Sequence, residues 1–298
     1  MSEPKTQSQS ETTLSAEQQL AQEQTDALLQ RVHESLATQT FDSSDQQTLK
    51  QMVESFSDSR GMTRLTIAET LGEIGKPATS VLLEGLANHP NPVVRRACAK
   101  TLTLIEDPDA IPTLINALGD EDTVVQASCA GALARLGEPA VSPLLSILET
   151  SAHSESIKGY VSWALAFMGP QIIDPLCEAF NSDSGDVRMA VVGAITNIIE
   201  SRQDEKLFNL LTTALQDSVE DVRCEAMAVL GSVAHQPAIP QLIELLSSTS
   251  EDTRKAAALA LMKIGDPVAL DPLKTAIAQE SDLGTQQALQ LAISQLEK

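Results

Sequence analysis

Three aromatic residues that lie close together in this sequence are the strongest candidates for a binding surface. Tyr160, Trp163 and Phe167 are spaced i, i+3 and i+7, which places all three on one face of a helix. The chain of 298 residues has only seven aromatic residues: five Phe, one Trp and one Tyr. Exposed rings at this spacing would favour binding of an apolar partner. The alternative is that the helix buries these rings in the core.

The histidines do not predict a metal site. None of them belongs to an H-E-x-x-H motif or has the spacing of metal ligands. One helical-repeat family, the iron-dependent hydroxylases, binds iron through repeated His-Glu pairs, and here only His33–Glu34 has that dipeptide. We therefore expect no bound metal. The four histidines are His33, His89, His153 and His235.

We interpret the cysteines as small apolar residues. Cys98 and Cys129 occupy equivalent positions in neighbouring repeats, where packed helix axes are about 8–10 Å apart, whereas a disulfide needs Cα atoms closer than about 7 Å. Cys177 lies in an apolar run, and Cys224 has no neighbouring histidine or basic pattern that would activate its thiol. We therefore predict neither a disulfide nor a nucleophilic cysteine.

A repeated pattern defines the elements that must position these residues. Apolar or small residues recur 3, 4, 7 and 10 positions after the start of each copy, and successive starts are 30 to 35 residues apart. This spacing predicts one amphipathic helix per copy. The eight copies start at Arg64, Arg95, Gln126, Lys158, Arg188, Arg223, Arg254 and Thr285.

A second helical pattern, opened by proline, lies between the copies. Proline is tolerated in the first turn of a helix, where its missing N–H would have no partner. Matching prolines occur at Pro112, Pro143, Pro175, Pro240 and Pro272. A helix, a tight turn and a second helix, repeated at intervals of about 31 residues, predict an all-α fold: a right-handed α-solenoid of about eight helical hairpins, an armadillo-type superhelix.

The repeat frame also predicts the neighbours of the aromatic residues. The equivalent positions of most other copies are polar or small, so this face of the second helix is expected to be exposed and to line the concave side. Gly131 and Gly193 flank Trp163 in the adjacent copies and would leave open space beside the indole. Arg135 would lie next to Phe167, where its guanidinium suits a partner that carries carboxylates.

A basic residue recurs at the first position of most copies. Because it recurs throughout the array, we interpret it as structural and expect it to pair with acidic residues of adjacent turns. The acidic run Asp120, Glu121 and Asp122 is interpreted as a solvated turn.

The charge and hydropathy of the chain exclude several classes of partner. With 41 acidic and 20 basic residues the net charge is −21, which argues against nucleic acids and anionic membranes as partners. No segment has roughly 18 unbroken apolar residues, so we expect no membrane insertion. The first residues, MSEPKTQSQSETT, lack the basic and apolar regions of a signal peptide. A cytoplasmic protein that binds another protein is the expectation.

We predict three parts of the chain. Residues 1–15 are polar and form a disordered tail, residues 16–57 form N-terminal helices and a cap, and residues 58–298 form the repeat solenoid. Ser15 and Gln18 match a capping box at the start of the first helix.

The repeat phrase resembles the HEAT-like repeat of the phycobilisome (bilin) lyase family. It occurs as TRKAAALALMKIGDPVALDPL, and KGYVSWALAFMG is similar to the aromatic-rich helix of E/F-type bilin lyases at Tyr160 and Trp163. The family attaches linear tetrapyrroles to phycobiliprotein cysteines, and relatives act in bilin removal or phycobilisome breakdown. The resemblance implies a cyanobacterial or red-algal setting, with phycobiliprotein subunits or a second HEAT-like subunit as partner. It implies no resident cofactor but a transient phycobilin.

Three functions follow as hypotheses. The first is a protein that binds phycobiliproteins, their bilins or both, as a lyase-like, chaperone-like or phycobilisome-breakdown factor. The second is a non-enzymatic scaffold whose protein partner has no connection with pigment. The third, an iron-dependent hydroxylase, is disfavoured because the repeated His-Glu pairs are missing.

Overall fold

The protein consists of α-helices joined by short turns in the computed structural model, which describes residues 15–202 and 204–298. No strand occurs within these residues, so the all-α prediction is confirmed. The predicted disordered tail falls almost entirely outside the described residues, and only Ser15 of it is described. Ser15 caps the first helix and forms the predicted capping box with Gln18.

The helices belong to two compact units, one that ends at Thr113 and one that spans Leu114–Lys298. The boundary falls within α6 (Ile111–Asn116). The first unit holds α1 (Ala16–Ala37), α2 (Gln46–Glu54), α3 (Gly61–Ile74), α4 (Thr79–Asn88) and α5 (Pro92–Ile105). The earlier division at residues 57 and 58 stays a prediction.

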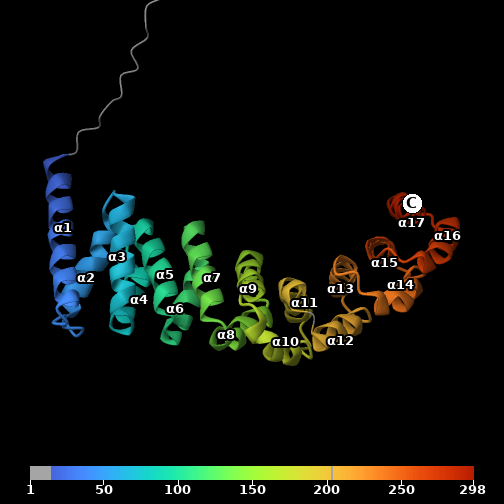
Figure 1. Ribbon diagram of the computed structural model, residues 1–298, viewed down its shortest axis with the longest axis horizontal. Helices are drawn as coiled ribbons and strands as arrows, with labels where there is room; N and C mark the ends of the chain where they lie inside the picture. The colour runs from blue at the N-terminus through green and yellow to red at the C-terminus, as the bar shows by residue number, and fades with distance from the viewer. Residues whose placement is uncertain (1–14, 203) are drawn as a thin grey trace, which may run out of the picture. The chain divides into compact units, whose positions relative to one another are not determined.

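The second unit continues the same alternation of helices. Its members are α7 (Thr123–Leu136), α8 (Glu138–Leu148), α9 (Glu155–Phe167), α10 (Ile173–Ala179), α11 (Gly185–Ser201), α12 (Glu205–Ala214), α13 (Glu220–Ser232), α14 (Ile239–Leu245), α15 (Glu251–Ile264), α16 (Leu270–Gln279) and α17 (Leu283–Leu296). The odd-numbered helices of this unit pack on one another in sequence and form one row, as Figure 1 shows.

The eight predicted second helices are α3 and the later odd-numbered helices, and each begins two or three residues before the predicted repeat start. Polar side chains at the preceding position accept a hydrogen bond from the first turn, as Asn91, Asp122 and Ser184 do. The predicted inward positions are fully buried; Cys129, Ala130 and Leu133 of α7 are examples. Each hairpin pairs such a helix with the even-numbered helix before it, which confirms the predicted eight hairpins.

The first helix of several hairpins begins differently from the prediction. Several open with a short 3₁₀ turn at an earlier proline, such as Pro108–Ala110 before α6 and Pro267–Ala269 before α16. Proline suits either turn because its fixed φ matches both and its missing N–H has no partner there. Pro143 departs from the expected first-turn position, since α8 already begins at Glu138 and therefore contains Pro143 inside it.

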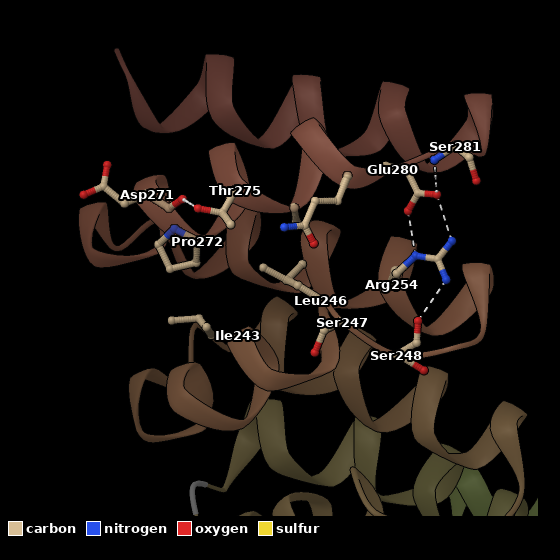
Figure 2. A pocket seen from close by; sticks show the side chains of 12 residues that line it. Ile243, Leu246, Ser247, Ser248, Arg254, Asp271, Pro272, Thr275, Glu280 and Ser281 are labelled. Carbon is tan, nitrogen blue, oxygen red and sulfur yellow. Dashed lines mark hydrogen bonds and ion pairs between the residues drawn. The ribbon is translucent and has the colours of Figure 1, made fainter.

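The recurring basic residue has the structural role that the sequence predicted, with one contact that it did not predict. Arg188 pairs with Asp217 of the next hairpin at 2.6 Å, and Arg254 pairs with Glu280 at 2.6 Å. Each also donates to a backbone carbonyl six residues earlier, as Figure 2 shows for Arg254 and Ser248. Gln126 at the equivalent position of α7 makes the same carbonyl contact, to Asp120.

Candidate functional site

The candidate site lies on α9, which is held in place by its apolar face. Ser154 caps the helix by accepting a hydrogen bond from Ile157 N–H. Val161, Ala164 and Leu165 are buried, so the orientation of the helix is fixed by packing. The helix packs between α7 and α11 in the second unit. This packing leaves the face with the aromatic residues on the outside.

The rings of Trp163 and Phe167 are exposed, not buried as core. Trp163 is 45% exposed and Phe167 is 60% exposed. The two rings stack on each other, with centroids 4.6 Å apart and an interplanar angle of 30°. Tyr160 is half-buried, and its hydroxyl donates to the carbonyl of Thr123 at 3.4 Å. We call Tyr160, Trp163 and Phe167 the α9 aromatic surface.

The flanking glycines leave open space, as expected. A Cβ atom added to Gly131 on α7 or to Gly193 on α11 would meet no heavy atom within 4 Å. Glycine costs a helix about 0.5–1 kcal/mol relative to alanine, and nothing inside the described protein requires it at these two positions. Both glycines therefore leave unpacked space on the helices that flank α9.

Arg135 of α7 and Asn197 of α11 lie on the two helices that flank α9. Arg135 is exposed in the last turn of α7, and its approach to Phe167 stays a prediction. Asn197 of α11 donates from its side chain to the carbonyl of Ala166 at 3.0 Å, which ties α11 to the end of α9 that carries Phe167.

Val124 adds to this apolar surface, and the repeat pattern did not predict it. Val124 is 43% exposed and follows Thr123, which accepts the hydrogen bond from Tyr160. The contact from α9 to the start of α7 could be predicted only from the offset between neighbouring helices, which the repeat spacing does not give. The apolar surface thus extends from Phe167 along α9 to the first turn of α7.

The described thiols are not activated. All four cysteines are free, as expected for Cys98 and Cys129, and burial raises the pKa of both these thiols to about 12. Burial also raises the pKa of Cys177 and Cys224 above the usual range. A thiol with a raised pKa stays protonated at neutral pH and is a poor nucleophile. The raised pKa values argue against a nucleophilic thiolate among the four cysteines.

Comparison with known proteins identifies the family. The family model for HEAT repeats matches residues 79–156 and 208–294. The bilin biosynthesis protein MpeU of Synechococcus sp. (strain WH8020) is 38% identical over 281 residues, which are 94% of this chain and 95% of that protein. The chain belongs to the HEAT-repeat bilin lyase family.

Two further likenesses fit this membership of the bilin lyase family. The phycocyanobilin lyase subunit beta of Nostoc sp. (strain PCC 7120) is 27% identical over 196 residues, which are 61% of this chain and 97% of that protein. The solved structure of Kap121p bound to Nup53p has a TM-score of 0.58 at 14% identity and covers 97% of this chain and 38% of that chain, which shows a shared helical-repeat fold alone.

Among the described residues, we found no group of three or more His, Cys, Asp or Glu side chains arranged to hold a metal ion. None of the described helices combines the length and the apolar character needed to cross a bilayer.

Proposed function

We propose that this HEAT-repeat protein binds phycobiliproteins and their bilin chromophores through the α9 aromatic surface, as a factor that guides the loading, protection or removal of the pigment. The observation that carries the proposal is the stacked and exposed pair of Trp163 and Phe167. The similarity to a bilin biosynthesis protein and to a phycocyanobilin lyase subunit supports the choice of partner.

The chemistry that this surface contributes is positioning. A planar conjugated chromophore, or an apolar helix that carries it, would stack on the indole and extend into the space beside Gly131 or Gly193. Arg135 would pair with a carboxylate of the bound molecule. The thiolate that forms or breaks a bond to a bilin would be that of the phycobiliprotein, because the described cysteines have raised pKa values. The protein's part is orientation of the reactants.

The proposal includes a cytoplasmic location and a protein partner, with a second HEAT-like subunit as one form of that partner. The relative that is named a lyase subunit supports this form. We expect no resident cofactor, and the phycobilin would be bound only during transfer.

The single tryptophan of the chain allows a direct test. Trp163 is the only Trp, so a change in its emission on titration with free phycocyanobilin, or with phycocyanin with and without chromophore, reports binding at this surface. We expect Trp163→Ala, measured by calorimetry, to weaken binding by about 30-fold, which corresponds to about 2 kcal/mol for loss of an anchor aromatic. Phe167→Ala keeps the reporter and should also weaken binding.

A matched control separates this effect from general loss of apolar surface. Val268 is as exposed as Phe167, at 60%, and lies in the same unit away from α9, so Val268→Ala should bind like the wild type. The circular dichroism of all variants should be unchanged. If Trp163→Ala and Phe167→Ala bind normally while folded, the α9 surface is not the binding site. If neither chromophore nor phycocyanin binds the wild type, the protein is a scaffold for an unrelated partner.

A further inference from the structure

A second surface of the protein lies between α8 and α10, which contact each other in the second unit. Two adjoining depressions of about 560 and 600 Å³ share four lining residues there and form one groove. Apolar groups form its floor, among them Val141 and Leu145 of α8 and Pro175 and Ala179 of α10. The first helices of two hairpins, α8 and α10, supply most of the lining of this groove, whereas the α9 aromatic surface lies on the second helix of one hairpin.

Carboxylates line this groove without ion-pair partners. Four carboxylates border the depressions: Glu138 of α8, Glu149 directly after α8, Glu178 of α10 and Asp183 in the turn after α10. Within the described residues no ion pair joins any of them, and no lysine or arginine is among the lining residues. Arg188 reaches the carbonyl of Ser182 at the end of the groove and interacts electrostatically with Asp183, but its ion pair is with Asp217 at 2.6 Å. We call this the α8/α10 acidic groove.

The equivalent groove between α14 and α16 shows that this charge pattern is not imposed by the repeat. That groove has a volume of about 650 Å³ and a similar floor of Ile243, Leu246 and Pro272. Two carboxylates line it: Glu280 is engaged by Arg254, as Figure 2 shows, and Asp271 lies at the other end of the groove. The same architecture therefore occurs once with one of two carboxylates neutralised by an arginine and once with four carboxylates and no basic residue in the lining.

We propose that the α8/α10 acidic groove binds a basic amphipathic segment of a protein partner. The floor would bury the apolar side chains of the segment, and the rim carboxylates would pair with its lysines or arginines. Charge complementarity commits the groove to a basic occupant, since an acidic segment would meet only like charges. This binding is independent of the α9 aromatic surface, because α8 and α10 form the opposite row of their hairpins.

A synthetic peptide serves as the probe. It is a fluorescein-labelled amphipathic helix of about 12 residues, matched to the length of α8, with leucines on one face and lysines on the other. The full-length protein should bind it in a fluorescence anisotropy titration and should not bind the version with glutamates in place of lysines. Trp163 emission should stay unchanged, which distinguishes this groove from the α9 surface.

Two double variants with the same change in net charge decide the location. Glu149→Lys with Glu178→Lys should weaken peptide binding by about tenfold and reduce its salt dependence. Glu244→Lys with Asp271→Lys, on α14 and α16, should change the affinity by less than about threefold. Equal losses in the two variants, or equal binding of the acidic peptide, would overturn the proposal, since either result means unspecific attraction or binding elsewhere. Unchanged circular dichroism is required of both variants.

Discussion

The basic residue at the start of the repeat joins three parts of the chain. The guanidinium of Arg254 donates to the carbonyl of Ser248 in the turn before its own helix and to both carboxylate oxygens of Glu280 in the next hairpin. The first contact gives a hydrogen-bond donor to a carbonyl in the turn between α14 and α15, and the second links consecutive hairpins. The presence of Gln126 at this position shows that the carbonyl contact needs a donor and not a charge. The charge itself is needed only for the link between hairpins.

The Arg254–Glu280 pair leads to a pH-dependent prediction. Hydrogen bonds from Arg254, followed by backbone N–H donors of Asp282 and Ser281, lower the pKa of Glu280 to about 2. Because this pKa is depressed, the stabilisation is fully present above the ordinary carboxyl pKa near 4.5 and is lost as the pH falls through about 2. Glu280→Gln should lower the free energy of unfolding by about 2 kcal/mol at pH 7 and by much less near pH 2.

Urea denaturation of both proteins at several pH values between 7 and 2 measures this difference. The Glu280 side chain is only 3% exposed, so salt should screen the pair weakly. Glu244→Gln, at an exposed carboxylate of α14, is the control and should be neutral at every pH. A pH-independent loss in Glu280→Gln would show that packing, and not the charge pair, stabilises this contact.

At the scale of the helix, replacing four helical glycines by alanine is expected to have opposite effects on stability in two pairs. Gly131→Ala and Gly193→Ala should each raise the free energy of unfolding by about 0.5–1 kcal/mol, because alanine favours the helix and its Cβ meets open space. Gly85→Ala should destabilise, because its Cβ would lie 2.8 Å from both Cys98 Sγ and Val53 Cγ1. Gly231→Ala should do the same, because its Cβ would lie 2.9 Å from Ala260 Cα. Thermal and urea unfolding measure the signs.

The second helices of the hairpins were predictable from the sequence because the same buried positions recur in every repeat. Inward positions such as Leu133 and Leu261 recur at helical spacing, so the second helices could be placed within three residues. The 3₁₀ turns before the first helices could not be predicted, because a proline such as Pro267 fits a 3₁₀ and an α turn equally well.

The candidate site was predictable only in part. The spacing of Trp163 and Phe167 predicted their shared face, and the small residues at Gly131 and Gly193 predicted the open space beside them. The contact between Tyr160 and the start of α7 depends on the offset of neighbouring helices, and the α8/α10 acidic groove depends on their separation. A periodic pattern fixes which side of a helix faces inward, but it does not fix these distances between helices.

For the whole molecule, the net charge of −21 is expected to limit stability through self-repulsion. The ion pairs between hairpins involve few of the 41 acidic residues, and several, such as Arg188–Asp217, are largely buried and weakly screened by salt. Screening should therefore weaken the repulsion more than the attraction.

Raising NaCl from about 0.02 to 0.5 M should raise the Tm by several degrees. Replacing Glu138, Glu149 and Glu178 by Gln should raise the Tm at low salt and reduce the salt effect. A Tm that falls with salt would instead mean that exposed ion pairs, such as Lys206–Asp174, dominate the electrostatic free energy of the fold.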